Sequence, residues 1–160
     1  MDSVTIRPYV NSDKTTLRHC VVQIQEFERK LDERMSPGEE IADRYLSDML
    51  IHASKPCACI FVADLDGAVV GYVAVNAKVT NDEPDEYNYE YAYISDVIVL
   101  ETARGKGIGK ALLAEAEKFA LEQGAHWLRI GVLGVNEGAH GLYQSLGFKP
   151  REIVLEKSLS

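Results

Sequence analysis

The fold is decided by residues 104–110, which read RGKGIGK. The preceding run, residues 89–100, is rich in β-branched and aromatic residues and predicts a long strand. Beyond the glycines, apolar residues recur at helical spacing from Ile108 to Phe119, and Gly124 is typical of a helix end. A glycine-rich turn between a strand and a helix presents backbone amides at the positive end of the helix dipole. Together with the basic side chains of the turn, this arrangement predicts a pyrophosphate-binding site.

Two better-known phosphate loops do not fit this turn. A P-loop would need glycine where the chain has Arg104, and Ser or Thr where it has Ala111. The dinucleotide fingerprint G-x-G-x-x-G would need glycine at Lys110 or at Leu112, depending on its start. These comparisons disfavour a nucleoside triphosphatase and a dinucleotide enzyme. The remaining alternative is that the glycines only make a tight turn.

Hydrophobic periodicity and turn residues predict the other elements. They are, in chain order, a strand over 5–7, helices with apolar stripes over 17–31 and 41–50, a hairpin of strands over 57–65 and 68–78, a strand over 127–132, a helix over 136–146 capped by Asn136 and closed by Gly147, and a last strand over 153–155. Residues 36–39 (SPGE) have the form of a capping box, and Asp66-Gly67 is typical of a type I′ hairpin turn. The expected order β-α-α-β-β-β-α-β-α-β describes one mixed α/β domain over residues 1–160, with about six mostly antiparallel strands and about four helices.

Composition places the chain among ordinary globular proteins. It has 160 residues, of which 46% are hydrophobic and 26% are charged, and a formal net charge of -8. The negative charge disfavours nucleic acid as the partner. No stretch approaches the roughly 20 apolar residues of a membrane span, and three cysteines without a spaced framework favour a reducing compartment. We therefore expect a cytoplasmic protein that binds neither membrane nor nucleic acid.

Two motifs together resemble a known family. Arg104, Gly107 and Gly109 match the pattern R/Q-x-x-G-x-G/A, and a second motif runs from Asn136 through residues 143–148, YQSLGF. With this spacing the chain resembles the GCN5-related N-acetyltransferases (GNAT) over essentially its whole length, most specifically from residue 96 to residue 148. The resemblance implies the GNAT fold and acetyl-CoA as the cosubstrate.

The resemblance also implies which residues bind acetyl-CoA. Backbone groups of residues 97–99 would pair with the pantetheine amides like an added strand, and an amide of Ile98 or Val99 would hold the oxyanion. The amides of residues 105–110 would hold the pyrophosphate, with added charge from Arg104 and Lys106. The expected cofactor-binding set is Val97, Ile98, Val99, Arg104, Gly105, Lys106, Gly107, Ile108, Gly109, Lys110, Asn136 and Tyr143.

Acetyl transfer to an amine requires a base for the amine proton and an acid for the departing thiolate. The resemblance makes Tyr143 the general acid, and the alternative is that its ring only covers the core. Strand alternation places Glu90 and Asp96 on one face, unless a bulge intervenes, so both are candidate bases. The alternative role of Asp96 is to anchor the strand through hydrogen bonds. Some relatives carry a glutamate where this chain has Gly131, and this difference leaves the base open.

The acceptor is suggested by the most individual features of the chain, a tyrosine row over residues 87–93 and an acidic loop over 81–86. Carboxylates and aromatic faces both attract cations. We therefore expect the acceptor to be a primary amine of a small molecule or peptide. The alternative is a solvated loop beside a packed aromatic strand.

Two functions fit these observations. The first is an acetyl-CoA-dependent N-acetyltransferase that acts by direct attack in a ternary complex, and the alternative is a non-catalytic acyl-CoA sensor. No metal site is expected, because Cys57 and Cys59 lack the second pair of ligands that zinc requires. The resemblance also suggests a homodimer, through the last strand around residues 152–157.

Overall fold

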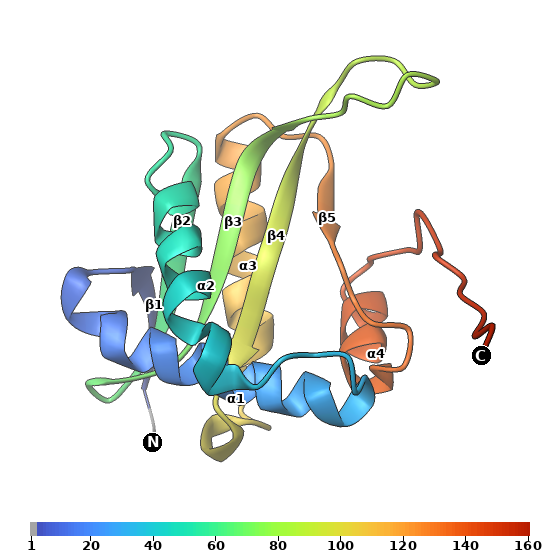
Figure 1. Cartoon of the computed structure of the whole chain (residues 1–160). Coiled ribbons are helices and arrows are strands. Elements are labelled where there is room, and N and C mark those ends of the chain that lie inside the picture. Colours follow the sequence, from blue (N-terminus) through green and yellow to red (C-terminus); the bar gives the residue numbers. More distant parts are fainter. Residues whose placement is uncertain (1–2) are drawn as a thin grey trace.

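The computed structural model describes residues 3–160 and contains one sheet with helices on both faces (Figure 1). Its strands are β1 (Val4–Pro8), β2 (Ala58–Leu65), β3 (Ala68–Thr80), β4 (Glu90–Val99) and β5 (Leu128–Ile130), and its helices are α1 (Lys14–Leu31), α2 (Gly38–Ala53), α3 (Ile108–Glu122) and α4 (Glu137–Ser145). The strands lie in the order β1-β2-β3-β4-β5, and only the β4–β5 pair is parallel. None of the helices within residues 3–160 is both long and apolar enough to cross a bilayer. The mixed α/β fold predicted from the sequence is confirmed.

Alternating residues of the central strands build a core on each face of the sheet. On one face Val62 and Tyr72 pack against Leu17 of α1 and Leu46 of α2. The other face packs against α3, and its central residues are Phe61, Val73, Ile94, Leu112 and Ala116. This two-sided burial fixes the strand register, because a slip by one residue would exchange the two cores.

Truncating the α3 contact is expected to test the second core. Leu112 is fully buried, so Leu112→Ala should lower the free energy of unfolding by about 2–5 kcal/mol, through lost burial and the cavity that remains. Leu121→Ala, on the same helix but at a residue 65% exposed, should change it by less than about 0.5 kcal/mol. Urea unfolding followed by circular dichroism measures both. Equal losses in the two variants would contradict the packing described.

Local turn chemistry behaves as the sequence predicts. Asp66 (φ 53°) and Gly67 (φ 90°) are both left-handed, as a type I′ hairpin turn requires. Gly147 is left-handed after α4, and the Asn136 side chain accepts a hydrogen bond from the Ala139 amide at the start of that helix. Short-range rules suffice at these positions because the turn is determined by its own residues.

The predicted capping box before α2 is wrong. The helix begins at Gly38, after Pro37, and no side chain of residues 36–39 caps it. Instead, the Gly38 amide donates to the Glu26 carboxylate of α1 at 2.7 Å. A Cβ at Gly38 would lie 2.8 Å from the Val22 carbonyl oxygen. Close packing of the two helices therefore replaces the local cap with one supplied by α1.

The predicted last strand over residues 153–155 is also wrong, so the sheet has five strands and not six. Residues 151–160 have no regular secondary structure, and Leu155 is 88% exposed. Ion pairs hold this segment at two points, Arg151 to Glu86 at 2.6 Å and Arg34 to Glu156 at 2.7 Å. An apolar run forms a strand only where it can pair with the edge of a sheet. Its composition does not determine whether such an edge is available.

Candidate active site

A β-bulge in β4 sets the direction of the candidate catalytic carboxylate. Ala74 of β3 is opposite Asp96, but the next residue, Val75, is opposite Ile94, so Ser95 is the extra residue. A bulge of this kind interrupts the alternation of side chains. Ile94 therefore packs on the α3 face, while Asp96 lies on the face of α1 and α2. The expectation that Glu90 and Asp96 share a face is wrong for this reason.

Beyond the bulge, β4 separates from β5. The parallel pairing covers only three residues of each strand and ends at the pair of Ile94 and Ile130 (Figure 1). Residues 97–99 remain paired with β3 on one side and have no β5 partner on the other. Because Leu100 donates its amide to Val70 of β3, alternation directs the amides of Val97 and Val99 toward the open edge and that of Ile98 toward β3. The open edge can accept an extended chain through Val97 and Val99, and the expectation that the Ile98 amide contributes there is wrong because that amide faces β3.

The glycine turn lies just beyond this open edge. Gly105 (φ 79°) and Gly107 (φ 77°) are left-handed, and nothing lies within 4 Å of a Cβ built at either. The first amide bonded within α3 is that of Ala111, which donates to the Gly107 carbonyl at 3.1 Å. The three amides before it, those of residues 108–110, have no acceptor inside the helix. Bare backbone, orphan amides and adjacent space suit a diphosphate.

The Arg104 side chain connects the glycine turn to β4 and α1. Its Nε donates to the Val99 carbonyl at 3.1 Å, and its guanidinium lies 5.7 Å from the centre of the Phe27 ring of α1. The side chain therefore ties the end of β4 to the turn and to α1. Its charge remains close to the anion site that the sequence predicts.

Asp96 is held by two tyrosines. The Tyr45 hydroxyl of α2 lies 2.8 Å from each carboxylate oxygen, and the Tyr72 hydroxyl of β3 lies 3.5 Å from one of them. The pKa of Asp96 is raised to about 6, chiefly by burial and also by the charge of Glu28, while the hydrogen bonds from the two hydroxyls act in the opposite direction. A carboxylate with this pKa is largely ionised at neutral pH and remains basic enough to take a proton.

Tyr143 approaches the same space from α4. Its side chain is buried, with 9% exposed, and its ring meets Phe148 edge-on at 5.9 Å. The pKa of Tyr143 is raised to about 12, chiefly by burial and also by the charges of Glu28 and Asp96. The phenol therefore stays protonated across the neutral range. The predicted acid and one predicted base are therefore within electrostatic range of each other near the open end of β4.

Three members of this cluster were not predicted from the sequence. Glu28 occupies the apolar stripe of α1, and burial raises its pKa. Tyr45 is on the predicted inner face of α2, and Tyr72 is in the middle of a buried strand. A carboxylate on an apolar stripe was the available signal for Glu28. Nothing local indicated that the two tyrosines would meet Asp96.

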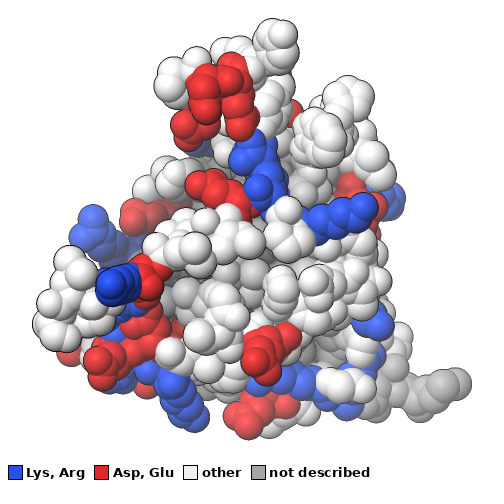
Figure 2. Space-filling view, turned by 90° about the vertical axis from the view of Figure 1, so that its right-hand side faces the viewer, with Lys and Arg blue, Asp and Glu red and all other residues white. Residues whose placement is uncertain are grey.

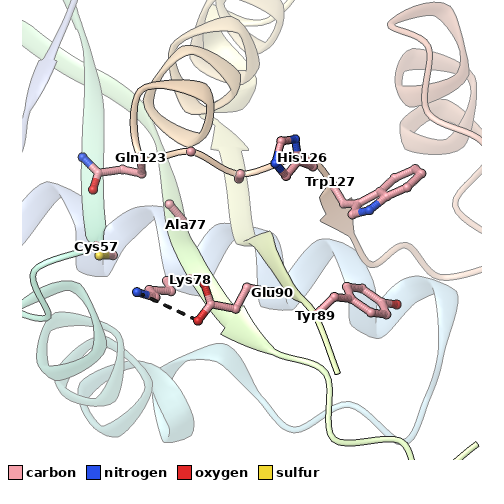
Figure 3. A pocket seen from close by; sticks show the side chains of 10 residues that line it. Cys57, Ala77, Lys78, Tyr89, Glu90, Gln123, His126 and Trp127 are labelled. Carbon is pink, nitrogen blue, oxygen red and sulfur yellow. Dashed lines mark ion pairs between the residues drawn. The ribbon is translucent and has the colours of Figure 1, made fainter. Parts of the chain in front are cut away.

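Glu90 is placed elsewhere. It begins β4, about 17–20 Å along the strand from Asp96. Its carboxylate lies 3.9 Å from the Lys78 ammonium, and it borders a hollow of about 390 Å³ with His126 and Trp127 (Figure 3). The structure does not bring Glu90 to the cluster around Asp96.

Two tyrosines of the row over residues 87–93 contact an arginine of the same chain. The Arg129 guanidinium lies 3.8 Å from the centre of the Tyr91 ring and donates to the Tyr89 hydroxyl. Glu86 accepts from Arg151, whereas other acidic side chains of the loop gather at one end of the molecule (Figure 2). Of the row, Tyr93 borders a pocket of about 490 Å³ that reaches Asp96. The row as a whole therefore does not face a cation site.

The glycine turn, the split strands and the acid-base cluster around Asp96 together are typical of an acyltransferase. A family model described as "Acetyltransferase (GNAT) family" matches residues 23–148. The chain therefore belongs to the GNAT acetyltransferase family.

Particular relatives extend this comparison. Human N-acetylaspartate synthetase is 38% identical over 61% of the chain, and mouse thialysine N-epsilon-acetyltransferase is 27% identical over 92% of this chain and 85% of its own. The chain spans only 30% of the length of the human enzyme. The aminoglycoside N-acetyltransferase AAC(6')-Iy, solved in complex with CoA, superimposes with a TM-score of 0.73 over 100% of this chain and 97% of its own, at 16% identity.

Proposed function

We propose that this protein transfers the acetyl group of acetyl-CoA to a primary amine by direct attack in a ternary complex. The observation that carries the proposal is the open edge of β4 next to the glycine turn, with Asp96 on this strand and Tyr143 close enough for the charge of Asp96 to raise its pKa. The names of the mouse relative and of the CoA-bound structure, which describe acetylation of a lysine analogue and of aminoglycosides, support an amine acceptor.

In this proposal, backbone groups supply most of the cosubstrate binding. The amides of residues 105–110 bind the diphosphate, Arg104 and Lys106 add positive charge, and Asn136, which caps the start of α4, also contacts the cosubstrate. Amides on the open edge of β4, those of Val97 and Val99, pair with the pantetheine arm and stabilise negative charge on the carbonyl oxygen. Acetyl-CoA supplies the thioester that is cleaved.

Two side chains move protons. Asp96 accepts a proton from the amine, whose nitrogen forms a bond to the acetyl carbon as the carbon–sulfur bond breaks. Tyr143 donates a proton to the departing sulfur and regains one from solvent, and Asp96 releases to solvent the proton that it accepted. Tyr45 and Tyr72 position the carboxylate through their hydroxyls. The products are an acetylated amine and a free thiol, so atoms and charge balance.

The glycine turn gives a test of cosubstrate binding. Gly107→Ala adds a Cβ at the anion site and should weaken acetyl-CoA binding at least about tenfold, since phosphate oxygens could no longer approach the amides closely. Gly124→Ala is the matched control, because Gly124 is also left-handed (φ 86°) with open space around it, but ends the same helix. Calorimetry measures both affinities. Equal weakening, or no binding by the folded wild-type protein, would contradict the proposal.

A further inference from the structure

The pocket beside Asp96 has walls of two kinds. It has a volume of about 490 Å³, within the ordinary range for small-molecule sites. One wall is α2, where Met49 and Ala53 face the pocket one turn apart, and the opposite wall is the sheet, with Ala74 and Val79 of β3. These four side chains are apolar. The part of the two walls that these residues form therefore offers no hydrogen bonds from side chains, while polar side chains such as His52, Asn76 and Ser95 lie elsewhere in the lining.

The charged side chains that line the pocket are two carboxylates. Asp96 lies where the pocket meets the catalytic cluster, and Asp48 of α2 is its second carboxylate. Neither Lys nor Arg is found among the lining residues in the described part of the chain. His52 is the one side chain there that could become cationic, and its Nδ1 lies 2.7 Å from the Asp48 carbonyl oxygen. The pocket thus suits a positive charge at its inner end and opposes a negative one.

Two tyrosines border the pocket near the carboxylate. Tyr45 and Tyr93 are each 39% exposed, and Tyr45 donates to Asp96. Their rings add apolar surface next to the place where an amine would meet Asp96. Aromatic faces accept both hydrocarbon and an adjacent ammonium group.

We infer that the acceptor is an alkyl or arylalkyl primary amine that carries no carboxylate. This inference rests on the proposed function and names its substrate class. The amine meets Asp96, and the hydrocarbon body lies between α2 and β3 against Met49, Ala53 and Ala74. Burial of that body supplies most of the binding energy, because apolar surface leaves water.

Polar acceptors fit the same walls poorly. A free amino acid would bring a carboxylate beside Asp96 and Asp48 with no Lys or Arg in the lining to pair it, and an unpaired buried charge is costly. A polyhydroxylated amine would leave unbonded those hydroxyls that lie against Met49 and Ala53, with a penalty for each. The pocket therefore selects against these acceptors as well as for a hydrocarbon body.

Three amines isolate these features. Phenethylamine has the amine and the apolar body, phenylalanine adds only a carboxylate, and ethanolamine lacks the body. The kcat/KM for acetyl-CoA cleavage should be at least about 100-fold higher for phenethylamine than for phenylalanine, and at least about tenfold higher than for ethanolamine. Calorimetry with CoA-loaded protein should give the same order of affinity. Equal or better use of phenylalanine or ethanolamine would overturn the inference.

A variant of the α2 wall tests whether this wall causes the preference for an amine with a hydrocarbon body. Ala53→Asp places a carboxylate against the hydrocarbon body and should lower phenethylamine kcat/KM at least about tenfold, with acetyl-CoA affinity unchanged. Ala114→Asp, at an exposed residue of α3, is the matched control and should have no such effect. If Ala53→Asp does not fold, the comparison of three amines on the wild-type protein still decides the question.

Failure of this inference is distinguishable from failure of the proposed function. Acetyl-CoA binding together with faster turnover of phenylalanine or ethanolamine would leave the proposed function standing and remove the substrate class. Absence of both acetyl-CoA binding and turnover in folded protein would remove the proposed function. In that case, phenethylamine binding that Ala53→Asp abolishes would still support the chemistry assigned to the pocket, and equal binding of all three amines would refute it.

Discussion

Tyr143→Phe is expected to lower kcat about 100- to 10,000-fold, the usual contribution of a positioned general acid. The phenol stays protonated at neutral pH because burial and the charges of Glu28 and Asp96 raise its pKa to about 12. Removing the hydroxyl leaves the departing sulfur without its donor. The ring and its edge-on contact with Phe148 remain, so acetyl-CoA affinity and the melting temperature should be nearly unchanged. Release of free thiol from acetyl-CoA measures turnover, and calorimetry measures affinity.

A matched control separates this role from a general loss of tyrosine. Tyr91→Phe removes a hydroxyl from a ring that lies under Arg129, outside the cluster around Asp96. It should retain wild-type kcat. If Tyr143→Phe also kept turnover within about threefold of wild type, Tyr143 would be a packing residue and the acid would have to be sought elsewhere. A protein with acetyl-CoA binding but no turnover of any amine would instead be the non-catalytic sensor.

Local features of the fold were open to prediction because their causes are local. The left-handed glycines of the turn, the hairpin at Asp66-Gly67 and the cap at Asn136 each depend on a few adjacent residues. Helical periodicity likewise predicted α3. The family motifs add spacing between such local features, which is why they indicated the whole fold.

Features that depend on a partner were not open to prediction. The bulge at Ser95 exists because β3 fixes the register of β4 on both sides of it, and it decides the direction of Asp96. The cap of Gly38 comes from Glu26 of another helix. The apolar run over residues 153–155 had the composition of a strand but has no partner in the sheet.

The environment of the candidate base could likewise not be predicted from the sequence. Tyr143 was a candidate because it belongs to a motif, whereas Asp96 and Glu90 were equal candidates from strand alternation until the bulge separated them. The pKa of Asp96 is set by burial and by Glu28, Tyr45 and Tyr72, which come from α1, α2 and β3. No spacing along the chain connects these elements, so only packing reveals the environment of the carboxylate.

Asp96→Asn should also lower kcat about 100- to 10,000-fold and should remove the acid limb of the pH profile. A base acts only when it is deprotonated, so wild-type kcat should fall about tenfold per pH unit below the pKa of about 6. The variant lacks the titrating group and should show a low, flat profile in this range. Its stability at neutral pH should not fall, because a neutral amide replaces a carboxylate whose ionised form is disfavoured by burial.

Two further variants test the assignment of Asp96 as the base through the direction in which the acid limb of the pH profile moves. The Tyr45 hydroxyl lowers the pKa of Asp96, so Tyr45→Phe should move the acid limb of kcat to higher pH. The Glu28 charge raises that pKa, so Glu28→Gln should move the limb to lower pH. The ionisation of the amine is common to all variants and cannot produce opposite shifts. A limb that stays in place in both variants, or that persists in Asp96→Asn, would show that another group takes the proton.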